Sequence, residues 1–152
     1  MISLRPAIVA DAATIRTMIL SERLDPSMLD WRNFIVAYDE AKGNANGAAN
    51  GGKIVGIAQM KPYADCREFG SLAVAPDYRN QGIGGRLIRT LIGREQGDVW
   101  LLCRDTNAPY YDKFGFEVMA RSDAPKTLQK KLRVTRLFGM FGIKVVCMKL
   151  RR

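Results

Sequence analysis

The heptapeptide Arg79-Asn80-Gln81-Gly82-Ile83-Gly84-Gly85 lies between a run typical of a strand, residues 69–74, and a run typical of a helix, residues 83–92. The helical run places its apolar side chains on one face: Ile83, Leu87, Ile88, Leu91 and Ile92. Such a helix packs against a sheet and leaves its first turn open. Because that turn has unpaired N–H groups and glycines allow close approach to the backbone, the stretch predicts a phosphate or pyrophosphate site.

Two common phosphate motifs do not fit this stretch. The Walker A motif fails because no Gly-Lys-Ser/Thr occurs nearby. The dinucleotide motif G-x-G-x-x-G fails because Leu87 stands at its third glycine, although Asp105 lies at a suitable distance downstream. Taken alone, residues 79–84 are equally compatible with a plain glycine turn, so the rest of the chain has to decide.

Length and composition predict one domain over residues 1–152. A chain of 152 residues with 47% apolar content has room for one sizeable core. No stretch approaches the roughly 18 to 20 apolar residues of a membrane span. Arg5, Asp11 and Arg16 interrupt the first twenty residues, which argues against a signal peptide. We therefore expect a cytoplasmic protein with no membrane partner.

The chain contains no histidine, which removes the commonest general base and the commonest metal ligand. We expect no metal, and a base made from a carboxylate, a tyrosine or a chain of waters. Cys66, Cys103 and Cys147 are far apart and odd in number, which favours reduced packing residues over a catalytic thiol.

The net charge of +9 belongs to the C-terminal segment. Residues 126–152 carry nine basic and no acidic side chains and so account for the whole excess. A solvated basic helix face is the simplest interpretation. Nucleic-acid binding is a weaker one, because the segment lacks an array of exposed aromatic residues and matches no recognition motif.

Sequence patterns predict the elements in chain order. Strands are expected from residue 2 to Pro6 and at 34–38, 53–63, 66–74, 99–103, 116–119 and 143–150. Helices are expected after Asp11 as N-cap, at 26–31, 83–92 and 107–114, and from Asp123 as cap and Pro125 to about residue 137. The glycine-rich and asparagine-rich residues 43–52 read as a hairpin loop.

Three segments together resemble the GNAT superfamily of N-acetyltransferases. Residues 79–84 fit its Arg/Gln-x-x-Gly-x-Gly/Ala loop, and Leu72-Ala73-Val74-Ala75-Pro76-Asp77-Tyr78-Arg79 resembles its Leu-x-Val-x-Pro-x-Tyr-Arg entry. Asn107-Ala108-Pro109-Tyr110-Tyr111-Asp112-Lys113-Phe114-Gly115-Phe116 is similar to its Asn…Ala…Phe-Tyr-Glu-Lys-x-Gly-Phe segment. The resemblance implies an α/β (α+β) acyl-CoA N-acyltransferase fold, a mixed, mostly antiparallel sheet of about six to seven strands with about four to five helices.

The resemblance also implies how acetyl-CoA binds. Backbone N–H groups of Gln81, Gly82, Ile83, Gly84 and Gly85 would hold the pyrophosphate. The side chains of Arg79 and Arg86 would add charge, and Asn80 would also bind the cofactor. The pantetheine arm would pair with the backbone of the strand before the loop, at Leu72, Ala73 and Val74, where that strand splays from its neighbour at a bulge. Asn107 would bond the pantetheine or the backbone.

The same resemblance implies the catalytic groups. Tyr111 would protonate the departing thiolate, and Glu68 matches the position of a glutamate that takes the amine proton. Without the resemblance, Glu68 reads as an exposed surface carboxylate and Tyr111 as a packing residue; Asp65 or Tyr63 acting through water could replace Glu68. An extra helix within residues 121–142 should wall the acceptor site with Arg121, Lys126, Lys130, Lys131, Arg133 and Arg136. Such charges would favour an amine that also carries a carboxylate or phosphate, or an acidic peptide.

The expected function is therefore acetyl-CoA-dependent transfer of an acetyl group to a primary amine, directly within a ternary complex. The alternative is an acyl-CoA-binding sensor with little catalysis. The partners would be acetyl-CoA and an amine acceptor of unknown identity, and a homodimer is compatible with the sequence.

Overall fold

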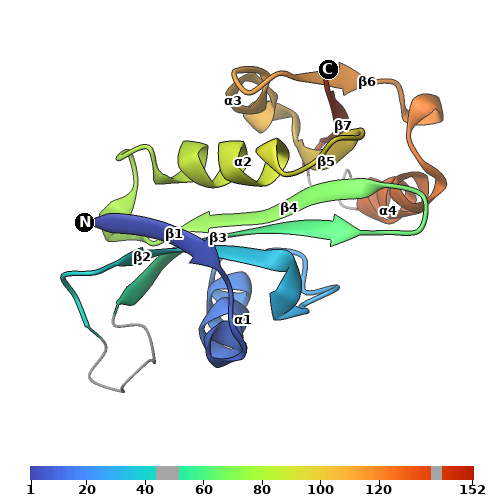
Figure 1. The fold of residues 1–152 in the computed structure, drawn as a ribbon. Helices are drawn as coiled ribbons and strands as arrows, with labels where there is room; N and C mark the ends of the chain where they lie inside the picture. Colours follow the sequence, from blue (N-terminus) through green and yellow to red (C-terminus); the bar gives the residue numbers. More distant parts are fainter. Residues whose placement is uncertain (44–51, 138–141) are drawn as a thin grey trace. The chain divides into compact units, whose positions relative to one another are not determined.

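The computed structural model describes residues 1–43, 52–137 and 142–152. Within them it contains seven strands and four α-helices (Figure 1). The strands are β1 (Ile2–Pro6), β2 (Phe34–Asp39), β3 (Lys53–Pro62), β4 (Arg67–Val74), β5 (Val99–Arg104), β6 (Phe116–Met119) and β7 (Val145–Leu150). The α-helices are α1 (Ala12–Ser21), α2 (Ile83–Gly93), α3 (Ala108–Asp112) and α4 (Lys126–Thr135). Short 3-10 helices are η1 (Val9–Asp11), η2 (Trp31–Asn33), η3 (Pro76–Tyr78), η4 (Asp105–Asn107) and η5 (Arg121–Asp123).

The strands follow the order β1-β2-β3-β4-β5-β7-β6. The β4–β5 pair is parallel, whereas β1–β2, β2–β3, β5–β7 and β6–β7 are antiparallel. The predicted mixed, mostly antiparallel sheet with flanking helices is therefore confirmed. The chain divides into two compact units, of which unit 1 is Met1–Met60 with Ser71–Arg94 and unit 2 is Lys61–Gly70 with Glu95–Arg152. Strands β3 and β4 each contribute residues to both units.

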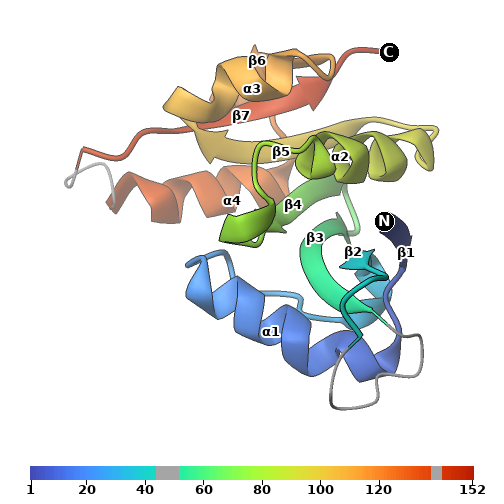
Figure 2. The same cartoon turned by 90° about the vertical axis from the view of Figure 1, so that its left-hand side faces the viewer.

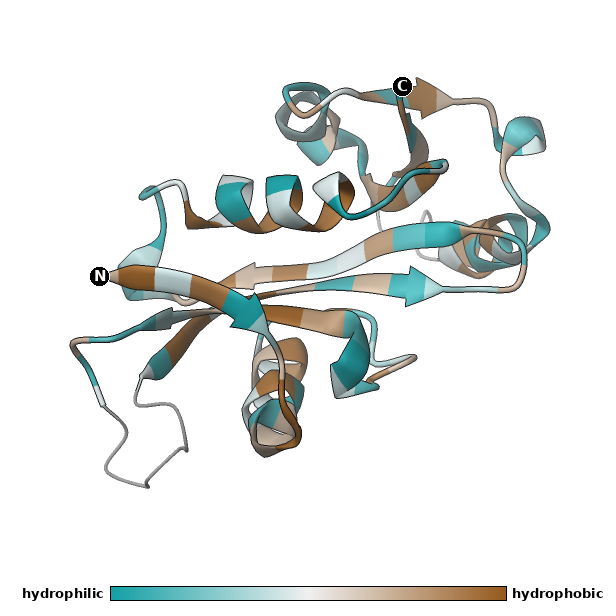
Figure 3. Ribbon diagram, viewed as in Figure 1, coloured by the Kyte–Doolittle hydropathy of each residue, from teal (hydrophilic) through white to brown (hydrophobic). Residues whose placement is uncertain are grey.

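In unit 1, α1 and α2 lie on opposite sides of the strands (Figure 1). Ile15 and Ile19 of α1 pack in one core cluster with Val36 of β2. Gly56 lies against α2 on the other side of the strands. A Cβ atom at this position would lie 3.2 Å from Leu87 and 3.3 Å from Ile83 of that helix. The absence of a side chain at this position lets the helix approach closely. Figure 3 shows the apolar residues of α2 turned toward the strands, as the predicted periodicity requires.

In unit 2, β5 and β7 lie between α3 and α4 (Figure 2). Leu128 and Leu132 of α4 are buried against Trp100 and Cys147. On α3, Tyr111 packs edge-on against aromatic rings of β4 and β6. Apolar residues on both faces of β5 explain its uninterrupted hydrophobic run.

The predicted helix at residues 26–31 is wrong. The Asp25 carboxylate accepts the N–H of Ser27 at 2.9 Å, and Met28 has a left-handed φ of 55°. A side chain that bonds its own backbone two residues on competes with helix formation, and a left-handed residue interrupts it. Helical geometry appears only in the short turn η2, at Trp31–Asn33.

Neither predicted N-cap makes a side-chain capping bond. The Asp11 carboxylate turns away from α1 and accepts hydrogen bonds from Arg5, at 2.6 Å, and from the N–H of Ile8, at 2.8 Å. At α4, the N–H of Thr127 is bonded at 3.0 Å by Asp65, not by Asp123. An acceptor distant in sequence therefore fills the role that the local pattern gave to Asp123. Residues 44–51 of the predicted hairpin loop lie outside the described residues.

Candidate functional site

The glycine loop of unit 1 turns the chain from η3 into α2 with two left-handed residues. Asn80 has a φ of 61°, and Gly82, the residue before the helix, has a φ of 79°. A Cβ atom at Gly82 would meet nothing within 4 Å. The glycine is therefore required by its backbone conformation rather than by crowding. The first helical bond joins the N–H of Arg86 to the carbonyl of Gly82, so α2 begins directly after the loop, as the sequence predicts.

Arg79 and Arg86, predicted to add charge to this loop, have partners within unit 1. The Arg79 guanidinium donates to both carboxylate oxygens of Glu22 at 3.0 Å and to the carbonyl of Val74 at 2.9 Å. Arg86 donates to the carbonyl of Ile2 at 2.9 Å. Both side chains are exposed. A phosphate that binds the Arg79 guanidinium must therefore compete with the Glu22 carboxylate.

Strand β4 has an unusual backbone conformation immediately before the residues predicted to pair with the pantetheine arm. Its ladder with β5 covers Arg67 to Phe69. Ser71 then has a left-handed φ of 54°, which is unusual for a residue with a side chain inside a strand. The Ser71 hydroxyl donates to Gln59 at 3.0 Å, and the Gln59 side chain donates in turn to the carbonyl of Met28.

Of the three residues beyond Ser71, Ala73 is buried in the core of unit 1. Leu72 and Val74 are half-buried. The N–H of Ala75 donates to the carbonyl of Val55 at 2.8 Å. A strained residue followed by half-buried strand backbone fits the splayed strand that the family resemblance implies.

Tyr111, the predicted acid, lies in unit 2 among aromatic rings. Its ring centroid is 6.3 Å from that of Phe69 and 6.2 Å from that of Phe116. Burial, with smaller contributions from Cys103 and Tyr110, raises the pKa of the Tyr111 phenol well above its usual value. A phenol with the ordinary pKa of about 10 already keeps its proton at neutral pH, and the raised pKa makes Tyr111 a weaker acid than a free phenol. Asn107 is exposed at the start of α3 and makes no capping bond.

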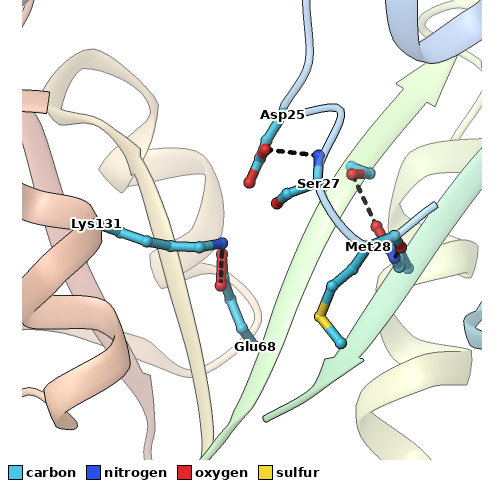
Figure 4. A network of polar contacts seen from close by, with 7 residues as sticks. Asp25, Ser27, Met28, Glu68 and Lys131 are labelled. Carbon is cyan, nitrogen blue, oxygen red and sulfur yellow. Dashed lines mark hydrogen bonds and ion pairs between the residues drawn. The ribbon is translucent and has the colours of Figure 1, made fainter. Parts of the chain in front are cut away.

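Glu68, the predicted base, is only 5% exposed, which excludes its interpretation as a surface carboxylate. Its two oxygens accept hydrogen bonds from the ammonium group of Lys131, at 2.9 and 3.3 Å (Figure 4). The same ammonium group lies 5.0 Å from the centre of the Tyr63 ring. The sequence placed Lys131 among the basic residues of the acceptor wall but did not predict its partner.

The six basic residues of the predicted wall divide into three groups. Lys131 faces Glu68. Three arginines, together with Ser122 and Gln129, line a hollow of about 280 Å³ in unit 2: Arg121, Arg133 and Arg136. Lys126 and Lys130 are exposed. The interpretation as a uniformly solvated helix face is therefore wrong for Lys131.

The alternative catalytic groups are less suited to the chemistry. Asp65 is engaged in capping α4, and its bond to Thr127 lowers the pKa of its carboxyl. Burial raises the pKa of Cys66 to about 12 and those of Cys103 and Cys147 to about 11. All three cysteines are unpaired, and these pKa values keep them as thiols, which are poor nucleophiles.

The described residues lack two features, a metal-binding cluster and a membrane-spanning helix. Residues 1–43, 52–137 and 142–152 contain no group of three or more Cys, Asp or Glu side chains arranged to hold a metal ion. In the same part of the chain, no helix combines the length and the apolar composition of a membrane span.

The predicted site residues thus fall into two sets. Those assigned to the cofactor lie in unit 1, except for Asn107, and the proposed acid and base lie in unit 2. Within unit 2, the Tyr111 ring contacts Phe69, the residue that follows Glu68.

Comparison with known proteins gives both a sequence and a structural relationship. The chain is 30% identical over 88 residues to the amino-acid acetyltransferase of Neisseria meningitidis serogroup A, an alignment that covers 54% of this chain and 20% of that protein. The chain therefore spans about a fifth of the curated relatives that it matches.

Solved structures share the fold. N-acetylglutamate synthase from Neisseria gonorrhoeae, complexed with coenzyme A and N-acetyl-glutamate, superposes with a TM-score of 0.74 at 19% identity, over 99% of this chain and 35% of that one. The NatC complex bound to Gag peptide and CoA gives 0.70 at 18% identity, over 99% and 98% of the two chains.

A family model described as the acetyltransferase (GNAT) domain matches residues 30–118. This match spans β4, the glycine loop and the segment that contains Tyr111. Since it also covers more than half of the sequence, the chain belongs to the GNAT acetyltransferase family.

Proposed function

We propose that this protein is an acetyl-CoA-dependent N-acetyltransferase that transfers the acetyl group directly to a primary amine. The observation that carries the proposal is the loop from Arg79 to Gly82, which opens the amphipathic helix α2 with two left-handed residues. Exposed N–H groups at a helix start bind phosphate groups well. Membership of the GNAT family supplies the context in which this loop holds a coenzyme A pyrophosphate.

The proposed chemistry needs a donor to the oxyanion, a base and an acid. A backbone N–H of the strand segment Leu72 to Val74 stabilises the oxyanion that forms when the amine attacks the carbonyl. Glu68 takes a proton from the amine. The new N–C bond forms, the C–S bond breaks, and Tyr111 gives its proton to the departing thiolate.

For the acceptor, we propose an amine that also carries a carboxylate or phosphate group. The hollow lined by Arg121, Arg133 and Arg136 offers three guanidinium groups, which bind planar anions well. A relative that bears the name amino-acid acetyltransferase supports the same class of acceptor. A single domain over residues 1–152, a cytoplasmic location and a possible homodimer stay predictions from the sequence.

Calorimetry of acetyl-CoA binding tests the coenzyme site directly. We expect binding to the parent protein and loss of binding in Gly84→Glu, because a carboxylate in the first turn of α2 repels the pyrophosphate. A matched variant, Gly93→Glu, places the same side chain at the far end of α2, where a Cβ atom meets nothing within 4 Å. It should bind acetyl-CoA like the parent. Absence of binding to the parent would contradict the proposal.

An amine panel then separates the enzyme from the acyl-CoA sensor. We expect turnover with acidic amines, such as amino acids, to exceed turnover with spermidine. If acetyl-CoA binds but no amine in the panel is acetylated, the sensor is the better description. The same holds if Glu68→Gln combined with Tyr111→Phe leaves any measured acetylation rate unchanged. A preference for spermidine would contradict the proposed class of acceptor.

A further inference from the structure

Lys131 presents a primary amine of the chain itself to the carboxylate proposed as the base. Its Nζ atom lies 2.9 Å from one oxygen of Glu68 and 3.3 Å from the other. The Lys131 side chain is 23% exposed, and that of Glu68 is 7% exposed. An acceptor amine that gives its proton to Glu68 must occupy this position or displace Lys131 from it.

The position of Lys131 on α4 separates it from the neighbouring lysines. Lys126 and Lys130 lie on the same helix but are exposed. The side of α4 that carries Leu128 and Leu132 is buried in unit 2, and Lys131 extends from the helix to Glu68. Three amines on one helix therefore differ mainly in their access to a carboxylate that can accept a proton.

We propose that Lys131 is a site of self-acetylation, an intramolecular reaction in which the chain's own lysine takes the place of the external amine. The proposal rests on the proposed function, because it uses the same acetyl-CoA and the same Glu68. Nζ forms a bond to the acetyl carbon as the C–S bond of acetyl-CoA breaks. The ammonium group loses two protons overall: one leaves through Glu68 to solvent, and the other balances the proton that the thiolate receives to become the CoA thiol.

Acetylation of Lys131 removes the charge that holds Glu68. An acetylated lysine is neutral and cannot form an ion pair. The Glu68 carboxylate then becomes available to the ammonium group of an external acceptor. Self-acetylation at this position therefore uncovers the base, whereas acetylation of Lys126 or Lys130 leaves the ion pair in place.

Isotope-labelled acetyl-CoA with peptide mass spectrometry tests this on the full chain. We expect label at Lys131 before Lys126 and Lys130, at a rate constant that does not change with protein concentration. Glu68→Gln should slow labelling of Lys131 by roughly 100-fold, the usual contribution of a general base, and leave the exposed lysines unchanged. Lys131→Arg keeps a cation beside Glu68, so it should lose the label at position 131, keep the label at Lys126 and Lys130, and acetylate external amines more slowly than the parent.

Acetylation by a reagent that does not use the coenzyme site provides the control for labelling by acetyl-CoA. Acetyl phosphate, which needs no binding site, should label the exposed Lys126 and Lys130 faster than Lys131. Lys130→Arg is the matched control for Lys131→Arg and should leave labelling at position 131 intact. If Lys130 is labelled faster than Lys131 by acetyl-CoA as well, self-acetylation at Lys131 is refuted.

The failures of the two proposals are distinguishable. If acetyl-CoA binds and external amines are acetylated while Lys131 stays unlabelled, only self-acetylation fails. If calorimetry shows no binding of acetyl-CoA, the proposed function fails and self-acetylation fails with it. Should Glu68→Gln not fold, as judged by circular dichroism, the concentration dependence of labelling in the parent still decides, because labelling between molecules rises with protein concentration.

Discussion

At the scale of single residues, Tyr111 joins an aromatic packing role to a proposed chemical one. Replacement by phenylalanine keeps the ring contacts with Phe69 and Phe116 and removes only the hydroxyl. We expect Tyr111→Phe to lower kcat by about 100-fold, the usual scale for loss of a general acid, with little change in the affinity for acetyl-CoA. Steady-state assays of CoA release measure kcat, and calorimetry measures affinity. Equal kcat values for parent and variant would assign the acid to another group.

The direction of the Tyr111 pKa shift gives a second test by pH. Because burial raises the phenol pKa above its unfolded value of about 10, the folded state retains this proton more strongly than the unfolded state. The corresponding stabilisation is present below about pH 10 and is lost as pH rises through the folded pKa. In urea titrations above pH 10, the parent should therefore lose stability more steeply than Tyr111→Phe. Parallel profiles would show that the phenol is not protected by burial.

The ion pair between Arg5 and Asp11 has a structural role and lies far in sequence from the proposed catalytic residues. Their side chains are 19% and 4% exposed. Removing one partner leaves a buried charge, so we expect Arg5→Ala to lower the free energy of unfolding by about 3 kcal/mol. Arg151→Ala, which breaks an exposed pair with Asp112, should cost less than about 1 kcal/mol. Similar losses in the two variants would contradict the role of burial.

The same pair predicts a pH dependence of stability. Burial alone would raise the Asp11 pKa, but hydrogen bonds from Arg5 and from the N–H of Ile8 outweigh burial and lower it. The stabilisation from the ionised Asp11 is therefore present above its unfolded pKa of about 4 and lost as pH falls through the lower folded pKa. The difference between parent and Arg5→Ala should accordingly shrink below about pH 4 in denaturant titrations.

At the scale of elements, the start of α4 depends on a carboxylate from the segment between β3 and β4. Asp65 accepts the N–H of Thr127, whereas Asp123, closer in sequence, makes no capping bond. We expect Asp65→Ala to destabilise the start of α4, because the N–H of Thr127 loses its capping acceptor. Asp123→Ala should cost almost nothing. Hydrogen exchange of the Thr127 amide measures both effects, and faster exchange in Asp123→Ala than in Asp65→Ala would locate the cap where the sequence pattern placed it.

Elements set by local patterns were predictable, and those set by distant partners were not. The periodicity of residues 83–92 predicted α2 with its buried face, because a helix repeats over a few residues. The contact between Glu68 and Lys131 joins residues 63 positions apart, and no local pattern encodes it. The false helix at 26–31 arose because Asp-Pro-Ser also starts turns, and here the side chain of Asp25 bonds the backbone of the turn.

At the scale of the whole molecule, part of the C-terminal charge is balanced by acidic residues from earlier in the chain. Lys131 pairs with Glu68, Lys149 with Asp98, and Arg151 with Asp112. All these residues belong to unit 2. Some basic residues of the C-terminal segment thus neutralise acidic residues of the same unit, which weakens the case for nucleic-acid binding. The hollow lined by arginines is then the clearest anion-binding feature of unit 2.

The two tryptophans report separately on the two units and so test whether residues 1–152 fold as one domain. Trp31 packs against the core of unit 1, and Trp100 is buried in unit 2. Each variant keeps one tryptophan. Because β3 and β4 contribute residues to both units, we expect the urea midpoint measured by fluorescence to equal the midpoint measured by circular dichroism, in Trp31→Phe and in Trp100→Phe. Acetyl-CoA at 100 times its Kd should stabilise both variants equally, by about 2.7 kcal/mol. Separate midpoints, or a shift confined to one variant, would mean that the units unfold independently and that the ligand stabilises only one of them.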